Sequence, residues 1–156
     1  MSTGRKVRVA HLEMSLTEPL TYPMSDGERE CSTVDHWADA VDQANEPCLV
    51  IDSRAVIAAA SPAACQLLGF GGPPAAAGLC LHDGVLPLID FTAAANPLPE
   101  TELAKIPPVQ ALLSERLARG LLRVRLGDDI VTIDAVATPL WADGDVAGSL
   151  TFFCTV

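Results

Sequence analysis

Cys80, His82 and Asp83 stand close together, and their side chains are of the types that act as nucleophile, base or metal ligand. A catalytic cysteine needs a base within hydrogen-bond reach and a third group that orients this base. A metal site needs a second set of ligands at a suitable spacing, and the sequence offers none. Residues two apart on a helix also do not face each other. We therefore expect these three side chains to lie in a loop or at the surface, and we predict no catalytic residue and no metal site.

The remaining polar clusters have simpler explanations than chemistry. Asp128-Asp129 and Asp143-Gly144-Asp145 have the composition of turns. The glycines of 69–72 lack the Lys-Ser/Thr ending of a phosphate loop, and His11 and His36 are expected in solvent. A basic cluster is formed by Arg116, Arg119, Arg123 and Arg125. A solvated face explains this cluster, and an anionic ligand or an acidic partner helix is the alternative.

Composition narrows the class of protein. The chain has 156 residues, with 49% hydrophobic residues, 20 Asp and Glu against 10 Lys and Arg, and a net charge of -10. This acidity argues against nucleic-acid binding. The five cysteines form no C-x-x-C pair, which favours reduced thiols, and no apolar run is long enough to span a membrane. We expect a cytoplasmic protein that binds no membrane.

The first half predicts a tail, a helix and a hairpin. Residues 1–31 have the composition of a mobile tail, and residues 32–46 form an amphipathic helix that begins with the capping types Ser and Thr. Residues 48–52 and 55–60 read as two antiparallel strands, which open a core that extends over 47–156. Ser61-Pro62 then starts a short helix that ends at Gly69.

The second half predicts one longer helix and a three-stranded meander. We expect a helical turn within residues 81–91, around Val85, Leu86 and Leu88-Ile89, and a helix from Pro107 to Gly120. Three β-rich runs follow, separated by Gly-Asp-Asp and Ala-Asp-Gly-Asp turns. Antiparallel strands at both ends with helices between them predict an α+β fold with the helices on one sheet face.

Alternation along the strands assigns an apolar face that meets the helices. On the last strand we place Leu150, Phe152 and Cys154 on this face, opposite Ser149 and Thr151. The apolar face is the one plausible ligand space, although a filled core is the simpler alternative. The predicted lining is Leu112, Leu113, Leu122, Val124, Ile133, Leu150 and Phe152.

The first helix and the other sheet face suggest a contact surface. The stripe of the helix, with Trp37, lies next to a sheet face that we expect to be partly apolar, and the helix could cover its own sheet or that of a second copy. The predicted dimer or partner surface is Val34, Trp37, Val41, Val136 and Phe153.

Three motifs in the right order resemble the PAS family of sensory and interaction domains. Residues 49–58 look like the opening hairpin of that family, and Ser61-Pro62-Ala63-Ala64-Cys65-Gln66-Leu67-Leu68-Gly69-Phe70 is similar to its N-P-A-A-x-x-L-L-G-Y helix. Ala137-Thr138-Pro139-Leu140, followed by residues 143–150, is similar to its closing hairpin. The resemblance covers residues 34–156 and implies a five-stranded antiparallel sheet with short helices on one face and an N-terminal flanking helix.

The resemblance does not extend to the cofactor-binding branches. Flavin-binding members carry an Asn-Cys-Arg-Phe-Leu type of run where this chain has Gly78-Leu79-Cys80-Leu81-His82. Heme-binding members take a histidine from the long helix, and residues 107–119 contain none, which leaves His82 as the alternative axial ligand. We expect no cofactor.

These features predict a non-enzymatic sensory or regulatory module in signal transduction. Family resemblance favours a homodimer, and because the last strand ends the chain we expect a signalling protein to be bound in trans, or a small apolar ligand. A small α+β-barrel enzyme with a pocket over the sheet and a heme-binding sensor are the alternatives. An enzyme would need an ionisable group inside the pocket, and the predicted lining is entirely apolar.

Overall fold

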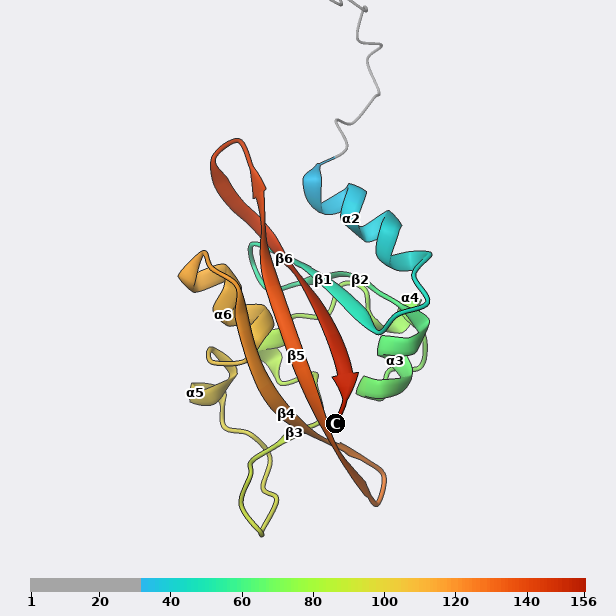
Figure 1. The fold of residues 1–156 in the computed structure, drawn as a ribbon. Coiled ribbons are helices and arrows are strands. Elements are labelled where there is room, and N and C mark those ends of the chain that lie inside the picture. Colours follow the sequence, from blue (N-terminus) through green and yellow to red (C-terminus); the bar gives the residue numbers. More distant parts are fainter. Residues whose placement is uncertain (1–31) are drawn as a thin grey trace, which may run out of the picture. The chain divides into compact units, whose positions relative to one another are not determined.

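The computed structural model describes residues 32–156, which form one antiparallel sheet and a set of short helices (Figure 1). The predicted mobile tail, 1–31, lies outside the described residues, and so does His11. The helices are α2 (Thr33–Asp42), α3 (Pro62–Leu68), α4 (Pro73–Ala76), α5 (Glu100–Leu103), α6 (Pro107–Ser114) and the single 3-10 turn η1 (Leu81–Asp83). The strands are β1 (Cys48–Asp52), β2 (Ile57–Ala60), β3 (Leu88–Ile89), β4 (Ala118–Leu126), β5 (Asp129–Ala142) and β6 (Asp145–Thr155).

The sheet has the strand order β2-β1-β6-β5-β4-β3, and every neighbouring pair is antiparallel. This confirms the predicted α+β class. Figure 1 shows β4, β5 and β6 as long ribbons that run side by side, with α5 and α6 beside β4. The sheet has six strands rather than the five that were predicted.

The sixth strand is β3, where a helical turn was predicted. Leu88 pairs with Val124 and Ile89 with Arg123. The main chain on either side is also bonded, because Arg125 N donates to Pro87 O at 2.9 Å and Leu98 N donates to Leu88 O at 3.0 Å. These partners are distant in sequence, so local propensity was a poor guide at these two residues.

Local sequence explains how α2 begins. Ser32 and Asp35 form a capping box, in which Asp35 N donates to Ser32 Oγ and Ser32 N donates to Asp35 Oδ2, at 3.1 and 3.0 Å. Val34 and Val41 are the buried side chains of this helix. Together with Leu150 and other apolar residues of the sheet they form a second core cluster, so α2 packs on its own sheet.

Ser61 connects three parts of the chain with one buried hydroxyl group. Its Oγ donates to Glu46 O at 2.7 Å and accepts from Cys48 N at 3.0 Å and Ala64 N at 3.2 Å. The last of these bonds caps α3, which ends as predicted at Gly69 in the left-handed conformation with φ 78°. The segment before β1, the strand itself and α3 thus meet at a single oxygen atom.

Helix α6 is shorter than the predicted helix from Pro107 to Gly120. It ends at Ser114, and Glu115 takes the left-handed conformation with φ 57°. The chain then enters β4 at Ala118, which pairs with Ala137. Ala111, Ala118 and Ala137 form a small buried cluster, and their short side chains let α6 approach the sheet closely.

The faces assigned to β6 were wrong. Phe153 pairs with Ala135 and lies in the main core, whereas Leu150 lies in the cluster under α2 and Phe152 is exposed. The inward residues of β6 are therefore Ser149, Thr151 and Phe153. The error has a physical cause: α2 buries part of the outer face, so both faces of β6 carry large apolar side chains and alternation alone cannot assign them.

Candidate functional site

The inner face of the sheet, where a ligand space was predicted, is packed with side chains. Leu122, Val124 and Ile133 belong to the main core cluster, and Leu112 packs against it partly buried. Leu113 is 70% exposed, while Leu150 and Phe152 lie on the outer face. Three of the seven predicted lining residues, Leu122, Val124 and Ile133, thus lie together in the inner core. Their role in ligand binding stays a prediction.

Polar groups on the inner face of β6 differ in their bonding. Ser149 Oγ donates to Pro108 O at 2.8 Å, which ties the strand to the start of α6. Thr151 is fully buried, and its Oγ1 has no hydrogen-bond partner among the described residues. A buried hydroxyl group without a partner costs free energy of folding.

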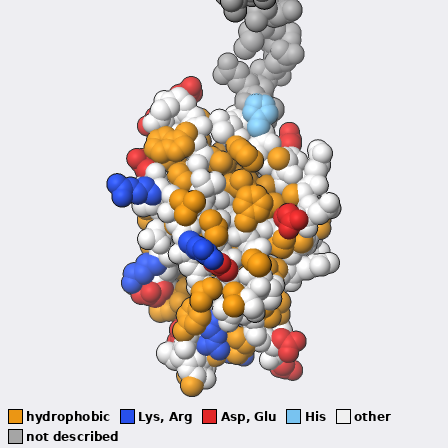
Figure 2. Space-filling model, in the orientation of Figure 1, with side chains coloured by type: hydrophobic (Ala, Val, Ile, Leu, Met, Phe, Trp, Pro, Cys, Tyr) orange, Lys and Arg blue, Asp and Glu red, His pale blue; other side chains and the backbone are white. Residues whose placement is uncertain are grey.

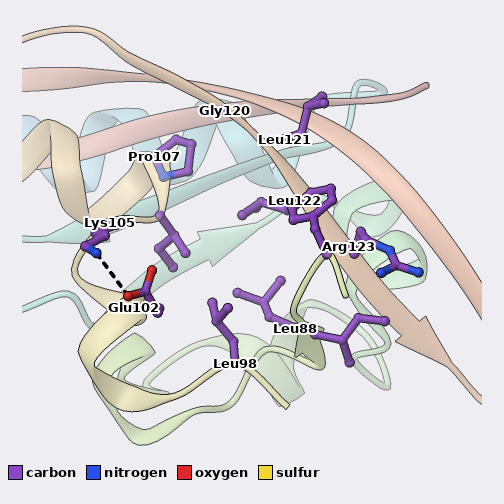
Figure 3. A pocket seen from close by; sticks show the side chains of 12 residues that line it. Leu88, Leu98, Glu102, Lys105, Pro107, Gly120, Leu121, Leu122 and Arg123 are labelled. Atoms are coloured by element: carbon purple, nitrogen blue, oxygen red, sulfur yellow. Dashed lines mark hydrogen bonds and ion pairs between the residues drawn. The ribbon is translucent and has the colours of Figure 1, made fainter. Parts of the chain in front are cut away.

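A pocket of about 180 Å³ lies at the edge of the sheet rather than over its inner face (Figure 3). Four consecutive residues of β4 line it, from Gly120 to Arg123, and since neighbouring residues of a strand point to opposite faces, only the strand's edge can present all four. The other lining residues are Leu88, Ile89, Phe91, Leu98, Glu102, Lys105, Ile106 and Pro107. Drug-sized ligands occupy roughly 300–1,000 Å³, so this pocket is small.

The charged groups at this pocket are engaged with neighbours. Lys105 Nζ and Glu102 Oε1 form an ion pair at 2.9 Å, which Figure 3 shows at the rim. Arg123 Nη1 donates to Asp90 O at 2.8 Å and to Thr92 O at 3.1 Å, and its guanidinium group lies 5.8 Å from the centre of the Phe91 ring. The partners of Arg123 are neutral carbonyl groups and an aromatic ring, so no carboxylate of the described residues neutralises its charge.

The loop after β3 is held by its own aspartate and by arginines of β4. Asp90 Oδ1 accepts from the main-chain N–H and hydroxyl group of Thr92 and from Asn96 N, and these bonds, above all the one from the Thr92 hydroxyl, lower the pKa of Asp90. Arg125 Nη2 donates to Ala95 O at 3.0 Å. Arg123 and Arg125 therefore fix this loop to the sheet.

The outer face of the sheet is partly covered by α2 and partly open. Trp37 and Phe152, with exposed fractions of 42% and 47%, line a groove of about 70 Å³ between helix and sheet. Val41, Cys48 and Leu150 also line it. Figure 2 shows hydrophobic side chains gathered over this side of the molecule. The large apolar side chains exposed on this face of the sheet include Leu121, Ile130 and Phe152.

The predicted dimer surface agrees with this face in part. Trp37 is exposed, and Val136 is half-buried on the outer face opposite Phe152. Val34 and Val41 are buried between α2 and the sheet. Phe153 lies in the core, so its assignment to a partner surface was wrong for the same reason as the faces of β6.

An ion pair crosses the outer face. Arg119 Nε donates to Asp134 Oδ1 and Oδ2, each at 3.1 Å, and Arg119 Nη2 donates to Oδ2. These bonds lower the pKa of Asp134. The predicted basic cluster is thus divided: Arg119 binds a carboxylate, Arg123 and Arg125 hold a loop, and Arg116 is exposed.

The residues first considered for chemistry do not assemble into a site. Cys80 Sγ donates to Arg54 O at 3.7 Å, and His82 and Asp83 are exposed on η1. Within residues 32–156 no group of three or more His, Cys, Asp or Glu side chains is placed to hold a metal ion. His36 is exposed on α2. None of the helices in this part of the chain is both long and apolar enough to cross a membrane.

A third hollow, of about 380 Å³, lies between the end of α2, β2 and α4. Its lining consists of short side chains together with one carboxylate: Asp42, Ala58, Ala59, Pro73, Pro74 and Ala77. Such a surface has few groups that could orient a ligand. The edge pocket and the outer face are therefore the candidate sites, and sequence analysis missed the first because a strand's free edge is a property of the folded sheet.

Solved structures resemble this fold, although no protein-family model matches the sequence and no curated protein matches it either. The PAS domain of a protein from Colwellia psychrerythraea is 16% identical with a TM-score of 0.54, over 80% of this chain and 98% of that one. A LOV protein from Rhodobacter sphaeroides is 16% identical with a TM-score of 0.57, over 80% and 67% of the two chains.

A third structure is a dimer. The VqmA dimer of Vibrio cholerae, described in the absence of its target DNA, is 14% identical with a TM-score of 0.55. The similarity covers 78% of this chain and 50% of that one, so the present chain spans half of the VqmA chain. These likenesses concern the fold alone. The likeness to these solved structures shows that this chain has a PAS-like fold.

Proposed function

We propose that this chain is a non-enzymatic sensory or regulatory module that acts as a homodimer and passes its signal to a partner protein in trans. The observation that carries the proposal is the open groove on the outer face, where Trp37 and Phe152 are each more than two-fifths exposed. Exposed aromatic side chains beside a buried apolar cluster are typical of protein–protein contact sites. The dimeric form of the VqmA neighbour supports dimerisation as such.

A twofold axis through this face would bring the same patch of each copy together. Trp37 of one copy would meet the groove beside Phe152 of the other, and Val136 would lie under the contact. The packed inner face favours a protein partner over a small apolar ligand as the second component. Cys80, His82 and Asp83 offer no paired nucleophile and base, which supports a binding role over a catalytic one.

Sedimentation of the full chain tests this proposal. We expect the wild-type protein to sediment at twice the 16.4 kDa of a single chain. Trp37→Glu and Phe152→Glu place a charge in the groove, and each is expected to give monomers, because an unpaired charge is costly to bury. Leu113→Glu is the matched control: it also replaces an exposed apolar side chain, but on α6, and it should leave the dimer intact.

Circular dichroism of all three variants checks that the monomers remain folded. A wild-type chain that is monomeric at about 100 μM would contradict the proposal, since a weaker contact corresponds to less than about 5.5 kcal/mol of binding free energy. Dimers that survive both groove substitutions would also contradict it and would place the contact elsewhere.

A further inference from the structure

The edge of β4 next to the pocket is not paired along its whole length. Strand β4 pairs with β5 over nine residues, from Ala118 to Leu126, but with β3 only at Arg123 and Val124. After Ile89 the chain leaves the sheet, because Asp90 N donates to Asn96 O instead of a β4 carbonyl group. Among the described residues, the edge of β4 from Gly120 to Leu122 therefore has no neighbouring strand.

The direction of the free main-chain groups follows from the bonds of β3. Arg125 donates its main-chain N–H to Pro87 O, away from β5. Along an antiparallel strand alternate residues point their N–H and C=O groups to the same side, so Arg123 and Leu121 also point away from β5. The main chain of Arg123 pairs with Ile89 of β3, but the N–H and C=O of Leu121 bond to no described residue.

The pocket lies directly beside these free groups and suits one large apolar side chain. On the inner side of the edge it is lined by Leu88, Leu98, Ile106, Pro107 and Leu122. Figure 3 shows Leu121 pointing away from Leu88, Leu98 and Leu122. Its volume of about 180 Å³ is well below that of a drug-sized ligand. It exceeds the roughly 150 Å³ that holds a benzene ring in an engineered apolar cavity.

The charges near Leu121 indicate which type of residue an added strand would place opposite it. A residue opposite Leu121 would face outward, and its diagonal neighbours on β4 are Arg119 and Arg123. Arg119 already binds Asp134, whereas the guanidinium group of Arg123 has no carboxylate partner among residues 32–156 and bonds to carbonyl oxygens beside Phe91. Glu102, the acidic lining residue, is paired with Lys105. The net charge of -10 opposes an acidic ligand, but distant charges are screened beyond roughly 8 Å at physiological salt.

We propose that the β4 edge binds an extended segment of a partner protein with the pattern apolar–acidic–apolar. The segment adds to the sheet antiparallel to β4, where β3 would continue. Its acidic residue exchanges two main-chain hydrogen bonds with Leu121 and directs its carboxylate to Arg123. One apolar neighbour fills the pocket. This is strand addition at a sheet edge, and it uses main-chain groups that the outer-face dimer does not need.

The probe is the acetylated and amidated peptide Ser-Thr-Phe-Glu-Val-Thr-Ser, and its binding to the full chain is measured by isothermal titration calorimetry. Methylation of the glutamate nitrogen removes the hydrogen bond to Leu121 O and should weaken binding at least fivefold. Methylation of the phenylalanine nitrogen is the matched control, because that N–H would point away from β4. Lysine in place of glutamate, and glycine in place of both apolar residues, should each weaken binding about tenfold or more.

A protein variant tests the second bond of this pair, in which Leu121 N donates to the carbonyl oxygen of the glutamate. Leu121→Pro removes an N–H that no described residue accepts, and proline is tolerated at such edge positions, so the fold should persist. Leu121→Ala removes the same side chain but keeps the N–H. We expect Leu121→Pro to bind the peptide at least fivefold more weakly than Leu121→Ala, with both variants sedimenting alike. Equal binding by the two variants, equal effects of the two methylated peptides, or no binding at about 1 mM would overturn the proposal.

Discussion

Both faces of the sheet carry apolar side chains, but they differ in how completely these side chains are covered. The inner face is closed by α3 to α6, and Ile133 on it is fully buried. Among residues 32–156, α2 is the helix that covers the outer face, and Ile130, on the same strand, is 41% exposed. The difference shows that the inner face maintains the fold, while the outer face leaves apolar side chains exposed, as the proposed dimer requires.

The largest expected effect separates these faces directly. Ile133→Ala should lower the free energy of unfolding by about 2–5 kcal/mol, because it leaves a cavity in the core. Ile130→Ala removes the same atoms from an exposed position and should cost about 0.5 kcal/mol or less. Urea denaturation of both variants measures the two values. Similar losses would mean that the outer face is as closely packed as the inner one.

A smaller loss is expected where α2 meets the sheet. A Cβ atom at Gly148 would press on the Ile51 carbonyl oxygen and lie 3.1 Å from Val34 of α2. Gly148→Ala should therefore destabilise the protein by about 1–3 kcal/mol, as overpacking does. Gly71→Ala is the control, because the nearest atom to its new Cβ is 3.9 Å away. Thermal unfolding compares them, and equal midpoints would show that the cover over the outer face is loose.

The next prediction concerns polar groups on the inner side of β6. Thr151→Val replaces a hydroxyl group that has no partner and should stabilise the protein by about 1 kcal/mol. Ser149→Ala removes the bond to Pro108 O and should destabilise it by a similar amount. Chemical denaturation should thus show changes of opposite sign at two positions of one strand. Destabilisation by Thr151→Val would reveal a partner for that hydroxyl group.

The smallest effect is a pH dependence on the outer face. Arg119 lowers the pKa of Asp134 below the ordinary value of 3.8, so the pair stabilises the fold above that value. This contribution is lost as the pH falls through the lowered pKa, when Asp134 becomes protonated in the folded state. The stability difference between wild type and Asp134→Asn should therefore shrink from pH 7 to below pH 3.8. Asp39→Asn is an exposed control on α2, and a difference that grows on acidification would contradict the assignment.

Features that depend on neighbouring residues in the sequence were predictable. The capping box at Ser32, the Ser61-Pro62 start of α3 and its end at Gly69 each follow from local chemistry, and the structure has all three. The turns of the meander and its antiparallel pairing were predictable for the same reason. Local hydrogen bonds and backbone preferences decide these features.

Features that depend on tertiary partners were not predictable. The two residues of β3 are extended because β4 lies beside them, and no pattern in the neighbouring sequence predicts so short a strand. Glu115 ends α6 in a left-handed conformation that a non-glycine residue seldom adopts. The edge pocket was not predicted for a related reason. It exists because β3 leaves the sheet at Asp90, whereas the periodicity of apolar residues in the sequence indicates the faces of a sheet and not its edges.

The single oxygen of Ser61 has a mechanical consequence. It joins the segment that descends from α2, the first strand and the first inner helix. A tilt of α2 that pulled on Glu46 would strain the Ser61 bond, and with it the anchor points of β1 and α3. The hydroxyl group thus couples the two sides of the sheet mechanically. A displacement of α2 on the outer face would be transmitted through it to α3 on the inner face.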